Sequence, residues 1–179
     1  YVWNEIDNGK FAFMELESRS FFTSNGFLQD RITLLDDSLF FILGTKLDYF
    51  GRGASEFQPT ARLLYTLDDS EFWLAVSRAV RADNEWIRGG GYLFDHHGTR
   101  FSVSPSSSLT SEKMVSYEAG YRQRLSDGIR WDVSLYTNEY SDLAMLELDP
   151  VAKTATLVNA LSGTAYGLEA QVTWTATPW

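Results

Sequence analysis

The chain has 179 residues, of which 44% are hydrophobic, and it carries a formal net charge of −9 with no cysteine. The missing cysteines exclude disulfides, thiolate metal sites and a thiol nucleophile. The negative charge argues against nucleic acid as a partner, because no basic stripe could displace phosphate counterions. No run of 18 apolar residues occurs, which excludes a membrane-spanning helix but leaves a spanning β-barrel open, since alternation dilutes hydropathy.

Seven segments are predicted to be strands, because apolar and polar residues alternate in them or because β-branched and aromatic residues are enriched. No segment shows a sustained 3.6-residue period of apolar residues between helix caps. The sequence therefore predicts an all-β chain, with strands at 21–35, 39–50, 57–67, 71–81, 114–125, 129–141 and 163–176.

The third segment, "FQPTARLLYTL" at 57–67, illustrates the two faces of these strands. Ala61 and Leu63 alternate with Arg62, and successive strand side chains point to opposite sides of a sheet. Two readings follow from this alternation. Either the apolar side packs in a protein core and Arg62 meets bulk water, or the apolar side meets lipid and Arg62 meets a water-filled lumen.

The connections between the segments alternate in length, which favours the lipid reading. Tight turns rich in Asp, Ser and Gly fall at 36–38, 68–70 and 126–128, and longer connections fall at 51–56, 82–113 and 142–162. In an antiparallel up-and-down meander every second connection lies at the same end. Transmembrane barrels gather short periplasmic turns at one end and long extracellular loops at the other. A soluble β-sandwich has no reason to sort its connections in this way.

Aromatic residues and charges agree with a barrel. Transmembrane barrels carry girdles of aromatic residues where the strands cross the membrane–water interface. Five aromatic residues on apolar faces lie close to the tight turns, where such a girdle would be: Phe41, Tyr65, Phe72, Trp131 and Trp174. Five charged residues fall on the polar faces: Lys46, Arg62, Glu118, Asp132 and Glu169. Arg78 shares the apolar parity of its strand, so it either reaches the lipid headgroups or is turned inward by a bulge.

Seven strands are an odd number, whereas single-chain bacterial barrels have an even number. We therefore expect residues 1–179 to be part of a larger barrel domain, with extracellular loops at 82–113 and 142–162. The second loop, "AMLELDPVAKTATLVNA", is predicted to extend two strands as a hairpin that turns around Asp149–Lys153.

Four stretches resemble the barrel of TonB-dependent outer-membrane receptors, and the resemblance as a whole covers about residues 18–179. They are "FLQDRITLLDDSLFFILGTKLDYF", "QPTARLLYTLDDSEFWLAVSRAVR", "SEKMVSYEAGYRQRL" and "NALSGTAYGLEAQVTW". The resemblance implies a 22-stranded barrel in the bacterial outer membrane, closed by a plug domain that this chain does not contain. It implies active uptake of a scarce nutrient, with an iron–siderophore complex as the favoured candidate, powered by TonB acting on that plug. The resemblance further implies that three charged residues face the lumen, namely Arg62, Glu118 and Arg122. They would either contact the plug or only keep the barrel interior polar and hydrated.

The long connection at 82–113 contains the candidate ligand-binding residues. Trp86 and Tyr92 offer flat aromatic surfaces, whereas Arg81, Arg88 and Arg100 offer cations for an anionic chelate. Recognition residues often lie on loops that a rigid scaffold positions. We therefore expect these five residues to help hold substrate above the lumen.

The sequence predicts no enzyme, no cofactor and no metal site. Asp95–His97 contains the only histidines, and adjacent side chains on an extended chain point apart, so a closed metal site lacks ligands. No nucleophile with a credible base and no phosphate-binding loop is present. Two other functions remain open, namely a soluble β-sandwich that binds carbohydrate through exposed aromatic rings and a passive porin-like channel.

Overall fold

The computed structural model describes residues 12–14, 22–50, 55–82, 90–106 and 108–176. The described residues form ten strands and no helix: β1 (Ala12–Met14), β2 (Ser24–Leu35), β3 (Leu39–Tyr49), β4 (Ser55–Thr66), β5 (Ser70–Arg81), β6 (Gly90–His96), β7 (Thr99–Val103), β8 (Glu112–Ser126), β9 (Ile129–Asp149) and β10 (Thr154–Trp174). No described segment forms a helix long and apolar enough to cross a membrane.

The predicted all-β class is confirmed, and the seven predicted strands correspond to β2, β3, β4, β5, β8, β9 and β10. One of the predicted long connections differs from expectation, because the connection at 82–113 contains the hairpin β6–β7. The connection at 142–162 extends two strands as predicted, since β9 and β10 are 21 residues long each. The predicted hairpin turn at Asp149–Lys153 is confirmed, and the Asp149 carboxylate accepts hydrogen bonds from the amides of Val151 and Ala152, each at 2.9 Å.

The chain divides into two compact units, which we describe separately. The sheet unit comprises Phe21–Val80, Lys113–Ser141 and Ser162–Trp179, and the loop unit comprises Tyr1–Ser20, Arg81–Glu112 and Asp142–Leu161. Strands β9 and β10 contribute residues to both units.

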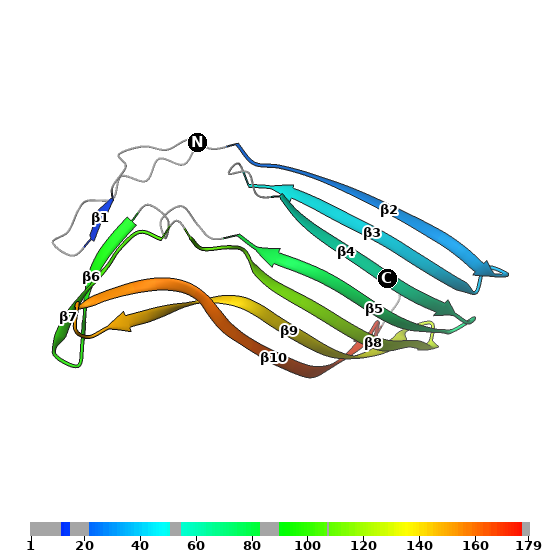
Figure 1. Ribbon diagram of the computed structural model, residues 1–179. Helices are drawn as coiled ribbons and strands as arrows, with labels where there is room; N and C mark the ends of the chain where they lie inside the picture. Colours follow the sequence, from blue (N-terminus) through cyan, green and yellow to red (C-terminus); the bar gives the residue numbers. More distant parts are fainter. Residues whose placement is uncertain (1–11, 15–21, 51–54, 83–89, 107, 177–179) are drawn as a thin grey trace. The chain divides into compact units, whose positions relative to one another are not determined.

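The sheet unit is an antiparallel meander in which β2, β3, β4, β5, β8, β9 and β10 lie side by side in that order (Figure 1). The β3–β4 ladder keeps one register over eleven pairs, from Leu39 opposite Tyr65 to Tyr49 opposite Ser55. Directly opposed residues share a face of the sheet. The polar sides of neighbouring strands therefore join into one polar face, and the apolar sides join into one apolar face. The tight turn at Asp36 and Asp37 has positive φ at both residues, a conformation that Asp tolerates better than most residues.

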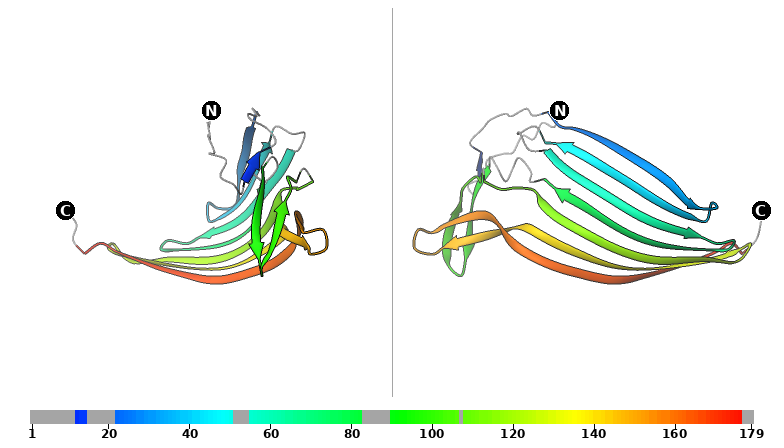
Figure 2. Two further views of the ribbon diagram at one scale, coloured as in Figure 1. Left: turned by 90° about the vertical axis from the view of Figure 1, so that its left-hand side faces the viewer. Right: turned by 45° about the vertical axis from the view of Figure 1, so that its right-hand side comes forward.

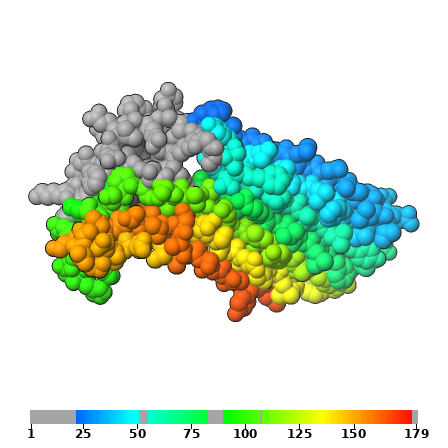
Figure 3. Space-filling model, viewed as in Figure 1, coloured from blue at the N-terminus to red at the C-terminus, as the bar shows by residue number. Residues whose placement is uncertain are grey.

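The apolar side of the sheet unit is uncovered. Among its described residues only Phe40 and Asp48 are buried, whereas large side chains such as Leu74, Leu135 and Trp174 are 54–71% exposed. Figure 3 shows atoms of β2, β3 and β4 on the face that is turned to the viewer. The apolar rows are therefore not packed against a second sheet within the described residues, and this contradicts the β-sandwich alternative.

The loop unit has a small core of its own. Strands β6 and β7 form a hairpin around His97 and Gly98, both of which have positive φ (Figure 2). The unit also contains a parallel pairing, because Thr154 and Ala155 of β10 lie opposite Ser102 and Val103 of β7. The core consists of Phe101, Val103 and Ala155, all at most 3% exposed, and is flanked by Tyr92, Phe94, Leu146 and Leu148.

Candidate functional site

The polar face of the sheet unit carries ion pairs and hydrogen bonds within strands and between neighbouring strands. The Lys46 ammonium lies 2.9 Å from the Asp48 carboxylate, and the Gln58 amide donates a hydrogen bond to the same carboxylate. Lys46 is opposite Gln58 and Asp48 is opposite Glu56, so all four side chains share one face. Arg62 belongs to the same face of β4, as the sequence predicts.

Arg78 is directed to this polar face as well. Its guanidinium lies 3.0 Å from the Glu56 carboxylate and donates a second hydrogen bond to the Phe57 carbonyl. Glu56 lies on the polar face of β4, opposite Asp48 of β3, so the ion pair draws Arg78 toward that face. Of the two orientations left open by the sequence, the structure therefore supports the inward one.

A tryptophan organises the centre of the polar face. The Trp73 indole N–H donates a hydrogen bond to the Glu118 carboxylate, and the Arg122 guanidinium lies 5.6 Å from the indole ring centre. Arg122 also lies 3.3 Å from Glu71 and 3.7 Å from Asp132. Glu118 and Arg122 thus share the polar face with Arg62, and their side chains have partners that fix their positions.

Glycine at position 120 makes room for this arrangement. A Cβ atom added at Gly120 would lie 2.0 Å from the Trp73 ring, closer than any real side chain allows. Sequence reasoning missed Trp73, because one tryptophan on the polar side of a strand gives no signal without knowledge of which strand lies beside it.

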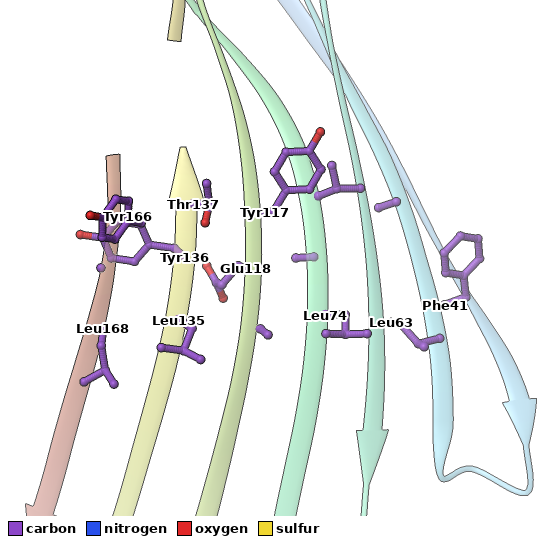
Figure 4. Close-up of a pocket in the computed structure, with 15 residues that line it drawn as sticks. Phe41, Leu63, Leu74, Tyr117, Glu118, Leu135, Tyr136, Thr137, Tyr166 and Leu168 are labelled. Atoms are coloured by element: carbon purple, nitrogen blue, oxygen red, sulfur yellow. The ribbon is translucent and has the colours of Figure 1, made fainter. Parts of the chain in front are cut away.

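The opposite face carries an apolar groove of about 1040 Å³. Figure 4 shows Leu63, Leu74, Leu135 and Leu168 at one height across four strands, with Tyr117 above them. Small-molecule sites combine such apolar lining with a few convergent polar groups. Here the side chains on the apolar face of each strand, which point into the groove, are mostly aliphatic or aromatic. The groove therefore suits hydrocarbon better than a polar ligand.

Aromatic rings gather beside the tight turns on the same apolar face. The Phe72 and Tyr121 ring centres are 4.4 Å apart, and those of Tyr121 and Trp131 are 5.3 Å apart. Tyr65 lies directly opposite Phe72. Two of the predicted girdle residues, Phe72 and Trp131, therefore join through Tyr121, which was not predicted, and a third, Tyr65, lies opposite Phe72.

The described candidate ligand residues have separate partners in the loop unit. Arg81 pairs with the Glu112 carboxylate, which also accepts a hydrogen bond from the Ala144 amide at 2.9 Å. Arg100 makes two hydrogen bonds to Asp95, at 3.0 and 3.1 Å. Tyr92 packs against the core of the loop unit. Trp86 and Arg88 lie outside the described residues.

The Asp95–Arg100 pair shifts the ionisation of both groups. The hydrogen bonds and charge of Arg100 lower the pKa of Asp95, and Asp95 raises the pKa of Arg100 in return. The two side chains are more than half exposed, so water screens the interaction. Beside them the His96 and His97 rings are 4.3 Å apart, and no described group of three metal-ligating side chains includes them.

An asparagine that the sequence analysis did not single out orders the segment before β8. The Asn159 carboxamide accepts a hydrogen bond from the Thr110 amide at 2.8 Å and donates one to the Thr110 carbonyl at 3.1 Å. It donates another to the carbonyl of Asp142, where φ is positive. Nearby, the buried Ser106 hydroxyl donates to the Leu157 carbonyl at 3.1 Å.

Comparison with solved structures finds siderophore receptors with the same fold. The siderophore receptor PirA from Pseudomonas aeruginosa aligns with a TM-score of 0.68 at 19% identity, over 83% of this chain and 30% of that one. A mutant of the ferric enterobactin receptor PfeA from the same organism, in complex with enterobactin, aligns with a TM-score of 0.72 at 17% identity, over 83% of this chain and 24% of that one. The FrpB iron transporter from Neisseria meningitidis aligns with a TM-score of 0.63 at 11% identity, over 87% and 24%.

The chain thus spans less than a third of the length of each of these proteins. No curated protein sequence matches it. A family model described as "TonB dependent receptor-like, beta-barrel" matches residues 5–179, nearly the whole sequence. The chain therefore belongs to the TonB-dependent receptor-like β-barrel family.

Proposed function

We propose that this chain is part of an outer-membrane receptor that takes up a scarce nutrient, with a ferric siderophore as the substrate class. The proposal rests chiefly on the uncovered apolar face of the sheet unit opposite a face rich in ion pairs. Such a sheet is unstable in water but suits a wall between lipid and a water-filled lumen. The family match and the siderophore receptors with the same fold support the substrate class.

The complete receptor would close the sheet into a 22-stranded barrel. In the described sheet unit β2 lies at one edge and β10 at the other. Unpaired backbone groups at such edges cannot be exposed to the hydrocarbon core, because each costs several kcal/mol without a hydrogen-bond partner. Further strands outside these residues would satisfy both edges, and a plug within the lumen would couple transport to TonB.

In this receptor the predicted ligand-binding residues lie in the loop unit, which we place on the extracellular side. An anionic chelate would compete with Glu112 for Arg81 and with Asp95 for Arg100. Trp86, Arg88 and Tyr92 would add aromatic surface and a further cation. Alanine replacement of Trp86 and Arg88 together should weaken ferric siderophore binding to the full receptor, and unchanged affinity would exclude them from the site.

The function can be tested by expressing the full receptor in a strain that lacks its own siderophore receptors. Uptake of radioactive iron supplied as ferric enterobactin or other ferric chelates should appear with the receptor and should require functional TonB. Entry that persists without TonB would instead indicate a passive channel. No uptake of any ferric chelate, in cells with correctly folded receptor, would overturn the proposed substrate class.

A further inference from the structure

The apolar face of the sheet unit contains a carboxylate that the proposed uptake function does not explain. Asp30 lies directly opposite Leu43, and the same row continues through Ala61 of β4 and Val76 of β5. Asp30 therefore shares the face that we place against lipid, whereas Arg31, next to it in the chain, lies on the polar face. The Asp30 side chain is exposed, and among the described residues none forms an ion pair or a hydrogen bond with it.

Asp30 also lies far from both ends of its strand's apolar face. On β3, Leu43 of the same row is four residues from Leu39, beside the tight turn, and six residues from Tyr49. Four residues of strand span roughly 13 Å, so the short side chain of aspartate cannot extend to the lipid headgroups as a lysine or arginine does. A charge at this depth in hydrocarbon is costly, and such residues in membrane proteins usually pair with another group.

The β3 side of Asp30 offers no cation within reach. Its direct neighbour there is Leu43, and its diagonal neighbours are Phe41 and Thr45. Strands β2, β3 and β4 contain three cations, all of them on the polar face: Arg31, Lys46 and Arg62. On its other side β2 is the edge of the described sheet unit, with no strand beside it (Figure 1). A partner for Asp30 within the sheet can therefore come only from that free edge.

The neighbouring side chains favour a partner at the free edge over one that approaches through the lipid. Leu28, Ile32 and Leu43 surround Asp30 on the apolar face. Their side chains are about as long as that of aspartate, so the carboxylate does not protrude beyond them. A second membrane protein would have to insert a long side chain between these three residues. A residue on an adjacent antiparallel strand has its Cβ atom only about 5 Å from that of Asp30, well within reach of a lysine or arginine.

We propose that the strand pairing with the free edge of β2 in the complete receptor carries a lysine or arginine opposite Asp30, and that this ion pair sets the register of the two strands. The proposal rests on the proposed function, because it takes the sheet unit as part of a closed barrel in lipid. The cation donates charge-assisted hydrogen bonds to the carboxylate. Hydrocarbon screens their attraction much less than water does, so the pair is stronger here than on a wet surface.

An ion pair specifies what the apolar pattern of a strand leaves open. A slip of one residue turns every side chain of the strand to the opposite face, and the pattern itself prevents it. A slip of two residues keeps all the faces and costs little where the opposed side chains are aliphatic, as Leu28 and Ile32 are. With a cation opposite Asp30, the same slip leaves two unpaired charges in hydrocarbon. Setting a register is the best-attested role of a buried polar pair.

The first test locates the residue opposite Asp30 in the full receptor, in a background without other cysteines. Asp30→Cys is combined with single cysteines along the neighbouring strand, and each pair is oxidised in lipid vesicles. The cysteine that forms a disulfide most readily marks the opposed position, because a disulfide needs closely spaced Cβ atoms. We expect the natural residue at that position to be lysine or arginine. Any other residue there, or no disulfide along the strand, would overturn the proposal.

The second test asks whether the two residues act through their charges. Asp30→Asn, or glutamine in place of the partner cation, should each lower the ratio of folded to unfolded receptor in urea at least about tenfold, since each leaves one charge unpaired. Asp30→Lys should be more damaging, because it places two cations side by side. Adding an aspartate at the partner position should restore most of the loss. A charge exchange no more stable than Asp30→Lys alone would contradict the ion pair.

The matched control moves the carboxylate by one row without changing the composition of the strand. The double variant Asp30→Ile and Ile32→Asp should be destabilised at least as much as Asp30→Asn, because the displaced carboxylate no longer lies opposite the cation. A double variant as stable as the natural receptor would overturn the role in register, since the pair would then tolerate either row.

Neither test depends on uptake, because both are made on purified receptor. A receptor that transports no ferric chelate can still show the disulfide and the restored stability, and this result would overturn only the proposed substrate class. Normal TonB-dependent uptake by a receptor with an uncharged residue opposite Asp30 would overturn the ion pair and leave the proposed function intact.

Discussion

The sheet unit and the loop unit achieve their stability by different means. In the loop unit Phe101, Val103 and Ala155 are almost fully buried by their own neighbours. In the sheet unit a continuous ladder of strands leaves most large apolar side chains exposed, and the ion pairs lie on the other face. The loop unit therefore contains its own core, whereas the sheet unit needs an apolar environment supplied from outside. Four experiments, three on substitutions and one on pH, test this difference between the units.

The largest effect is expected from removing a core ring in the loop unit. Phe101→Ala should cost about 3–5 kcal/mol of local stability, because it leaves a cavity in a closely packed core. Hydrogen exchange of the β6, β7 and β10 amides should rise strongly. The matched control is Phe57→Ala in the sheet unit, where the ring is 53% exposed and little change is expected in detergent. Equal effects of the two substitutions would contradict the distinction between the units.

A charge on the apolar face should be the next most damaging change. Leu168→Arg places a cation in the apolar groove and should cost about 2–4 kcal/mol near the bilayer midplane. Gln171→Arg, three residues along the same strand and on the polar face, should cost much less. Unfolding of the full receptor by urea in lipid vesicles measures both. A reversed order of the two costs would mean that the polar face, not the apolar one, meets lipid.

A smaller effect is expected from crowding the polar face. Gly120→Ala forces a methyl group into the Trp73 ring and should cost about 1–3 kcal/mol, as overpacking typically does. The displaced indole should also lose its hydrogen bond to Glu118. In a Trp73→Phe background the same glycine change should cost less, because the smaller ring leaves room. Gly163→Ala is the control, since a Cβ atom there meets nothing within 4 Å.

The smallest effect is expected from acid. The folded-state pKa of Asp95 is lowered below its ordinary 3.8, so the pair with Arg100 contributes stability above that pH and loses it as pH falls through the folded value. Hydrogen exchange of the β6–β7 amides, corrected for the intrinsic effect of pH, should therefore rise slightly as the pH falls below 4. Asp95→Asn should abolish the pH dependence of hydrogen exchange in the hairpin and leave the pH dependence of exchange in the sheet unit unchanged. A dependence of the same size in Asp95→Asn would assign it to another group.

The strands of the sheet unit could be predicted closely because one face of each is apolar and the other polar. The alternation in 57–67 fixes both the strand and the side on which Arg62 lies, and the structure agrees. The β6–β7 hairpin was missed, although Gly98 after His97 is a recognisable turn signal. The parallel pairing of β7 with β10 gives no local signal, because it joins residues about fifty positions apart.

The site could be predicted less well, since its residues depend on partners that are distant in sequence. The sequence offers Arg81 as a cation for an anionic chelate, whereas the structure pairs it with the Glu112 carboxylate on another strand. The sequence leaves two orientations open for Arg78, toward the lipid headgroups or inward, and only its neighbour on β4 shows that it pairs with Glu56. The sequence shows where each charged residue stands along a strand. Which opposite charge lies beside it depends on how the neighbouring strand is aligned.

Asn159 shows how one side chain can make a loop inseparable from a distant strand. It both donates to and accepts from the backbone of Thr110, 49 positions away, because a carboxamide has a donor nitrogen beside an acceptor oxygen. An aspartate of the same shape would keep the accepted hydrogen bond and lose the two donated ones, turning an attraction toward two carbonyl oxygens into a repulsion. Transplanting residues 104–111 to another scaffold would thus require this asparagine to travel with them.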